Sequence, residues 1–254
     1  MEYYILQFIL LIVIFIRVIT LFSVAPIFNS EVIPIQIRIA ISLFFALTLF
    51  PLLKDTMPKI NLDLLSFVLL VVIEVVVGLI IGFMISLIFM GMQIAGEIMG
   101  FDLGFNIATI YDPETGNNPV LSRFLYYTAA LIFLLLNGHH FILESIKLSY
   151  ESVPIGGFSL NNQLVEKLIK TSSIIFIIAI KIAAPVIISL FLTNIALGIL
   201  ARIVPQMNIF IIGFPLKIGV GLLIISFMMP FIFVIFKKLL TAFEFNVVEL
   251  IRVM

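Results

Sequence analysis

Hydrophobic residues fall into six long runs along this chain, separated by short polar segments. A helix needs about 20 apolar residues to cross the hydrocarbon core of a bilayer. The pattern therefore predicts an all-α, polytopic membrane protein built from helix hairpins. The second run is short, and so is the fourth unless it continues through Asn137 to Ser149. The runs occupy approximately residues 3–25, 35–53, 62–92, 121–137, 172–200 and 209–236.

The third run has few residues that would stop a helix between Leu62 and Ala108. A continuous helix of that length would measure roughly 65–70 Å, more than twice the thickness of the hydrocarbon core. We expect either a break near Gly91 or Gly96, or helices that are not simply stacked in a bilayer.

Small residues recur at intervals of four within and beyond this run, and on a helix they would form one ridge with little side chain. Such a ridge lets another backbone approach closely, as small residues do between membrane helices. The spacing therefore predicts tight helix packing, and it leaves open whether the contact lies within one subunit or between subunits. The residues concerned are Gly78, Gly82, Gly96, Gly100, Gly104 and Ala108.

Residues 91–119 break the hydrophobic pattern with several polar and charged residues. Asp112-Pro113, Thr115-Gly116 and Asn118-Pro119 follow in close succession, and each is a turn or helix-stop signal. One interpretation is an extramembrane loop that joins two spans. The other is a helix, break and loop that lie in a pathway and close it. The residue types leave both open.

Composition supports the membrane assignment. Only 11% of the 254 residues are charged and the mean hydropathy is +1.33, whereas soluble domains carry about a quarter charged residues. The formal net charge is zero, which argues against nucleic acid as a partner. The first apolar run lacks a basic leader and a small-residue cleavage site, so we interpret it as a retained first span.

Basic residues are distributed unevenly between the two sides of the predicted spans. With the N-terminus inside, eight of them lie on the cytoplasmic side: Lys54, Lys59, Lys147, Lys167, Lys170, Lys237, Lys238 and Arg252. Four lie outside: Arg38, Arg123, Arg202 and Lys217. The positive-inside rule therefore favours a topology with both termini in the cytoplasm.

Three charged residues, Arg17, Glu74 and Lys181, lie well inside hydrophobic runs. Charges at such positions cost a few kcal/mol each and usually face a partner or a water-filled cavity. A Glu74–Lys181 pair is one arrangement, and functional and structural roles are equally compatible with the pattern. A small secondary transporter, acting without partners, is an alternative on the same evidence.

Candidate metal and catalytic chemistry is sparse. His139, His140 and Glu144 invite a metal interpretation, but they include the only two histidines, and catalytic metal sites usually have three protein ligands. The absence of cysteine excludes disulfides and thiolate ligands. No HExxH, GxSxG, P-loop or GxGxxG motif occurs. We therefore expect no metal, no cofactor and no enzymatic activity.

Three segments together resemble the FliR family of flagellar export-gate subunits, whose injectisome relatives are the SctT-type proteins. They are GMQIAGEIMGFDLGFNIATIYDPETG, LIFLLLNGHHFILESIKLSYESVPIG, and the early RVITLFSVAPIF with IPIQIRIAISLFFAL. The resemblance extends over essentially the whole chain and is closer to the flagellar branch. It implies a subunit of the bacterial inner (cytoplasmic) membrane in the flagellar basal body. An injectisome gate subunit is the alternative within the family.

The resemblance also implies partners. One copy of this chain would join FliP and FliQ in a cone of helical symmetry, with FlhB and FlhA nearby. Unfolded flagellar proteins would pass through its pore. The chain would be a single domain with a FliP-like part at about 1–170 and a FliQ-like hairpin and tail at about 171–254. The cone would sit largely above the membrane plane, which conflicts with six ordinary spans.

A loop near 101–118 would plug the closed pore in such an assembly. Glycine permits the loop to change backbone conformation at low steric cost, and apolar side chains there can fill a narrow lumen. The residues implied in plugging are Phe101, Gly104, Phe105, Asn106, Ile107, Ile110, Asp112 and Pro113.

Overall fold

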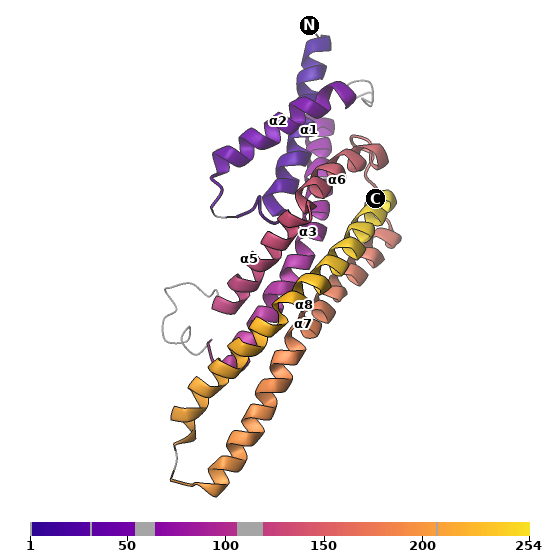
Figure 1. Cartoon of the computed structure of the whole chain (residues 1–254). Coiled ribbons are helices and arrows are strands. Elements are labelled where there is room, and N and C mark those ends of the chain that lie inside the picture. Colours follow the sequence, from indigo (N-terminus) through magenta and orange to yellow (C-terminus); the bar gives the residue numbers. More distant parts are fainter. Residues whose placement is uncertain (1, 31, 54–63, 106–118, 207) are drawn as a thin grey trace. The chain divides into compact units, whose positions relative to one another are not determined.

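A computed structural model describes residues 2–30, 32–53, 64–105, 119–206 and 208–254, and every regular element in these ranges is an α-helix (Figure 1). The all-α class predicted from the hydrophobic pattern is confirmed for the described residues. The helices are α1 (Glu2–Val24), α2 (Ile35–Leu53), α3 (Leu64–Leu103), α5 (Val120–Leu135), α6 (Gly138–Ser152), α7 (Asn162–Ile203) and α8 (Ile209–Val253).

The third helix is not interrupted at Gly91 or Gly96, contrary to the first of the two expectations. It runs continuously for 40 residues, which corresponds to about 60 Å. Helices α7 and α8 are longer still, at 42 and 45 residues, and extend well beyond the hydrophobic runs that predicted them. All three exceed the length needed to cross a bilayer core.

The fourth hydrophobic run continues past Asn137, but not as a straight helix. Helices α5 and α6 meet at an angle of 73°. Asn137 lies at the bend with φ 59° and ψ 26°, a left-handed conformation that asparagine adopts more readily than most residues. By length and composition, five described helices could each cross a membrane, or six spans result if the bent pair counts as one.

The chain divides into two compact units, and each is described by itself. The first comprises residues 1–87, 137–172 and 241–254, and the second comprises residues 88–136 and 173–240. Helices α3, α7 and α8 each contribute residues to both units.

The first unit is organised around α1. Its Phe22 ring stacks on Phe28 at 4.4 Å between centroids and meets the edge of Phe45, on α2, at 5.9 Å.

In the same unit, the end of α8 is bonded to the start of α7. There the Asn161 side chain donates to the Val253 carbonyl oxygen at 2.8 Å, and Lys167 pairs with Glu249.

The second unit has an aromatic centre at Phe89 on α3. Its ring lies 5.3 Å from Phe133 and 5.8 Å from Tyr126, both on α5, and 6.2 Å from Phe236 on α8. Aromatic pairs at these separations contribute about 0.5–1.5 kcal/mol beyond the burial of their area. The cluster therefore holds the later part of α3 against α5 and α8.

Candidate functional site

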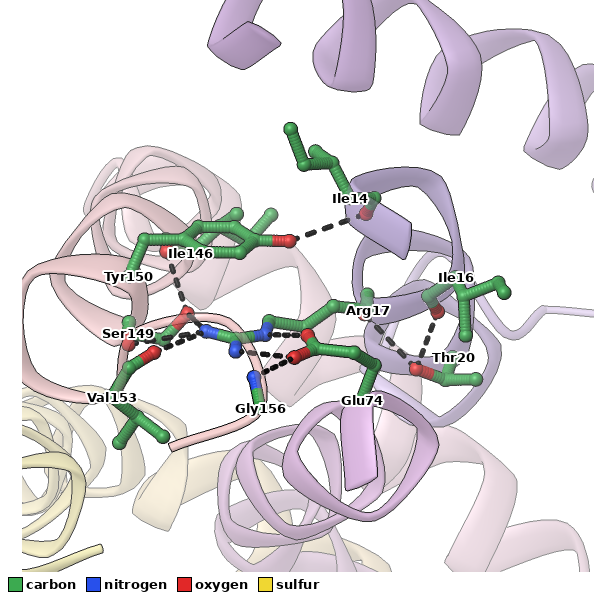
Figure 2. Close-up of polar contacts among 10 residues, drawn as sticks. All are labelled: Ile14, Ile16, Arg17, Thr20, Glu74, Ile146, Ser149, Tyr150, Val153 and Gly156. Carbon is green, nitrogen blue, oxygen red and sulfur yellow. Dashed lines mark hydrogen bonds and ion pairs between the residues drawn. The ribbon is translucent and has the colours of Figure 1, made fainter. Parts of the chain in front are cut away.

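A buried ion pair joins Arg17 of α1 to Glu74 of α3 in the first unit (Figure 2). Their side chains are 1% and 0% exposed. Arginine Nε lies 2.5 Å from Oε2 of the glutamate, and Nη2 lies 3.0 Å from Oε1. Two parallel contacts of this kind match the planar guanidinium to the carboxylate and fix their mutual orientation.

The remaining groups of the pair are satisfied by α6 and by the segment that follows it. Arginine Nη1 donates to the carbonyl oxygens of Ser149, at 3.2 Å, and Val153, at 3.0 Å. The backbone N–H of Gly156 donates to Oε1 of Glu74 at 3.1 Å. The hydrogen bonds that these buried charges require are thus supplied within the unit.

Tyr150 of α6 completes the cluster. Its ring lies 4.0 Å from the guanidinium carbon of Arg17, within the range of a cation–π contact. Its hydroxyl group donates to the carbonyl oxygen of Ile14, on α1, at 3.3 Å. We name Arg17, Glu74, Ser149, Tyr150, Val153 and Gly156 the Arg17 cluster. It links α1, α3 and α6, and its charged groups are occupied by one another and by backbone atoms.

Glu74 is therefore the partner of Arg17 and not of Lys181, and the Glu74–Lys181 pair considered from the sequence is not formed. Lys181 lies on α7 with its side chain exposed, and no partner for it occurs among the described residues. Arg17 and Glu74 could be identified as candidate residues from the sequence, because they are charged residues within apolar runs. Ser149, Val153 and Gly156 could not, because they contribute mostly backbone atoms, which leave no mark in side-chain patterns.

Two glycines on α3 let the backbone of α1 pack closely against α3 beside the Arg17 cluster. A Cβ atom at Gly78 would lie 2.6 Å from the carbonyl oxygen of Arg17, and one at Gly82 would lie 2.8 Å from that of Leu21. Both distances are shorter than real Cβ contacts allow. The absence of a side chain at these two positions therefore determines the spacing of α1 and α3.

The second unit has a comparable contact between α3 and α5. A Cβ atom at Gly96 would lie 2.5 Å from Cα of Ser122. The Ser122 hydroxyl group donates to the carbonyl oxygen of Gln93 at 3.0 Å, which ties the two helices at the same level. Gly91 faces Ile178 of α7 in the same unit.

Helix α3 ends immediately before Gly104, so a helical ridge at four-residue spacing extends only to Gly100. The N–H of Phe105 donates to the carbonyl oxygen of Gly100, and that of Gly104 donates to the carbonyl oxygen of Phe101, each at 3.0 Å. Gly104 has φ +83°. This is the Schellman arrangement, which requires a left-handed residue and so favours glycine.

Only part of the plugging region inferred from the resemblance is described. Phe101 is 75% exposed on the last turn of α3. Asn106, Ile107, Ala108, Ile110, Asp112 and Pro113 lie outside the described residues.

The two histidines lie together at the start of α6, with ring centroids 4.2 Å apart. The Nδ1 atom of His139 is buried without a hydrogen-bond partner within the described ranges. In the same ranges no group of three His, Cys, Asp or Glu side chains is placed to hold a metal ion.

Comparison with known proteins places the chain in a family. The family described as Bacterial export proteins, family 1, matches residues 8–243. The flagellar biosynthetic protein FliR of Bacillus subtilis is 34% identical over 229 residues, 89% of this chain and 88% of the relative. The Escherichia coli protein of the same name is 34% identical over 219 residues, 85% and 82% of the two chains. The surface presentation of antigens protein SpaR of Shigella sonnei is 34% identical over 120 residues, 47% and 46%. The chain therefore belongs to family 1 of the bacterial export proteins.

Proposed function

We propose that this chain is a structural subunit of the flagellar type III protein-export gate and is not an enzyme. The observation that carries the proposal is identity of 34% to flagellar biosynthetic proteins over most of both chains. The helical architecture supports the proposal. Five described helices are long and apolar enough to cross a membrane, and the bent pair α5 and α6 would make a sixth span.

The proposed mechanism is that of a conduit. One copy of the chain joins several copies of FliP and FliQ in the inner membrane at the flagellar basal body, with FlhB and FlhA nearby. Residues 1–170 form the FliP-like part and residues 171–254 the FliQ-like hairpin and tail. Unfolded flagellar proteins pass through the shared pore. The Arg17 cluster suits this role, because a conduit needs helices held in one fixed arrangement and no reactive group.

Purification of a tagged copy from native membranes, followed by the mass of the intact complex, tests the assignment. We expect one copy of this chain with several FliP and FliQ chains. A lone monomer that binds or moves a solute would contradict the proposal and favour a secondary transporter. Recovery of injectisome counterparts would identify the gate of a virulence system instead, an alternative that the partial similarity to SpaR favours.

We further propose that residues 101–118 plug the closed pore, a role that rests on the family resemblance. Deleting residues 107–117 removes a constriction, and membranes containing the assembled complex should then leak small ions or dyes. The complex must be recovered at its normal mass, so that leakage is not a consequence of failed assembly. Unchanged permeability in intact complexes would count against the plug.

A further inference from the structure

Lys181 is an isolated charge on an exposed, apolar part of α7. Seven apolar residues precede it and seven follow it, from Ile174 to Ile188. Its side chain is exposed, and no hydrogen bond or ion pair to it is formed by the described residues. A charge in such a run is costly without a partner.

Large apolar side chains share the face of α7 on which Lys181 lies. At 3.6 residues per turn, five of them fall within about 40° of Lys181 around the helix axis. All are 45–60% exposed. We name this face the Lys181 stripe, formed by Ile177, Lys181, Ile188, Leu192, Ile195 and Ile199.

Neither lipid nor water alone suits the stripe. Lys181 is 11 residues from Lys170 and 21 from Arg202, the nearest basic residues of α7, or about 16 and 32 Å along the axis. Lysine side chains reach lipid headgroups only near the ends of a span. The ammonium group of Lys181, in the middle of the apolar run, is therefore too far from the phosphate of a lipid headgroup to pair with it. In water, five large apolar side chains would remain exposed, which is unfavourable over a contiguous surface.

We propose that the Lys181 stripe is a docking surface for an apolar helix of a different subunit that carries one carboxylate opposite Lys181. The apolar side chains would be covered by the partner helix, and the lysine would gain the counter-charge it lacks. The inference rests on the proposed multi-subunit gate and adds the chemistry of one contact within it.

Site-specific photo-crosslinking identifies what covers the stripe. A photoreactive amino acid replaces Ile188, which shares a helical face with Lys181, in the complex assembled in native membranes. We expect crosslinks to an apolar segment of another protein that contains an aspartate or glutamate. Crosslinks only to lipid, to a segment without a carboxylate, or to a second copy of this chain would overturn the proposal.

Charge variants test the ion pair itself. Lys181→Met keeps the approximate length of the side chain and removes the charge, and it should lower the yield of co-purified partner by roughly threefold to thirtyfold, the range that measured interhelical polar contacts imply. Lys181→Arg is the matched control and should retain the partner. Lys181→Glu should lose it, and a carboxylate-to-lysine change in the crosslinked segment should restore it.

The two proposals fail in different ways. If the unaltered chain recovers no other subunits, the export-gate assignment fails. If the unaltered chain and all three Lys181 variants recover partners equally, only the Lys181 contact is wrong. The thermal midpoint of the purified single chain should be the same for Lys181→Met and the unaltered chain, because no described residue pairs with Lys181.

Discussion

Arg17 and Glu74 carry opposite charges in surroundings where either alone would be strongly unfavourable. Desolvation of both ions offsets much of their mutual attraction, so a buried pair contributes little net stability compared with apolar residues of similar size. Breaking such a pair, by contrast, leaves one charge uncompensated. We infer that the Arg17 cluster serves to define one arrangement of α1, α3 and α6, because only that arrangement satisfies both ions.

Single and double substitutions separate these effects. Arg17→Met or Glu74→Met alone should cost about 3–5 kcal/mol, which for a chain of this size lowers the thermal midpoint by roughly 6–20 °C. The double variant should lose less than the sum of the two, since no unpaired ion remains. The midpoint can be measured on detergent-purified protein by loss of the monodisperse species.

An exposed ion pair of the same unit provides the control. Lys147 and Glu151 lie 3.7 Å apart on α6 with side chains 65% and 57% exposed. Lys147→Met should change stability by less than about 1 kcal/mol, as is typical for surface pairs.

Additive losses from the Arg17 and Glu74 substitutions would mean that the two side chains are not energetically coupled.

The sequence identifies Arg17 and Glu74 as unusual but does not pair them. They are 57 residues apart, and hydropathy gives no distance between two helices. Until the helices are placed, Glu74 could pair with either Arg17 or Lys181. The contribution of Gly156 depends on a backbone N–H, and every residue except proline has one.

At the scale of helices, glycines inside long helices differ in what lies beside them. Gly96 of α3 lies against the backbone of α5, whereas a Cβ atom at Gly219 of α8 would meet nothing within 4 Å. Periodicity predicts the small-residue ridge on α3, but the spacing alone does not distinguish a glycine in contact from one in open space.

Alanine substitutions at these two positions should therefore have different effects on stability. Gly96→Ala forces α3 and α5 apart, and overpacking of this kind typically costs about 1–3 kcal/mol, or roughly 2–12 °C in the thermal midpoint. Gly219→Ala should be neutral or stabilising by up to about 1 kcal/mol, because alanine is the better helix former. A Gly96→Ala protein as stable as the unaltered chain would show that the contact is easily displaced.

The end of α3 shows where a periodic pattern misleads. Four-residue spacing extends through Gly104 to Ala108 in the sequence, yet the helix stops at Leu103 because Gly104 adopts the left-handed conformation. The same residue type supports close packing inside a helix and termination at its end, so spacing cannot tell the two uses apart.

Substitution at Gly104 tests this termination. Gly104→Ala places a Cβ atom on a residue with positive φ, which costs about 1–2 kcal/mol, and it should lower the thermal midpoint of the purified chain by roughly 2–8 °C. Gly104→Asn should be milder, because asparagine tolerates the left-handed region. Equal midpoints for all three proteins would contradict a stabilising role for this cap.

At the scale of the whole molecule, hydropathy predicts the number of apolar segments but not how far each helix extends. The predicted runs end where apolar residues end, whereas α8 continues through the charged pair Lys237-Lys238 and α7 begins ten residues before its apolar run. Helix propagation needs only backbone hydrogen bonds and tolerable side chains, so the helical ends are set by packing and by caps rather than by hydrophobicity.

Orientation in the membrane can be tested by cysteine labelling, since the chain has no cysteine of its own. With both termini in the cytoplasm, Gln206→Cys lies on the opposite side of the membrane. It should react with a membrane-impermeant maleimide added to cells in which the outer face of the cytoplasmic membrane is accessible to the reagent. Ser159→Cys should react only after the membrane is permeabilised. Labelling of both positions from the same side would mean that α7 does not cross the bilayer.

The sequence separation within the Arg17 cluster has a consequence for biogenesis. Glu74 is synthesised 57 residues after Arg17, and Val153 is 136 residues after it. At about 5–20 residues per second, the arginine waits roughly 3–11 s for its counter-ion and roughly 7–27 s for the last of these acceptors. A helix carrying an unpaired arginine is a poor substrate for early release into lipid. We therefore expect α1 to remain with the insertion machinery until α3 and α6 emerge, so that the three helices leave together.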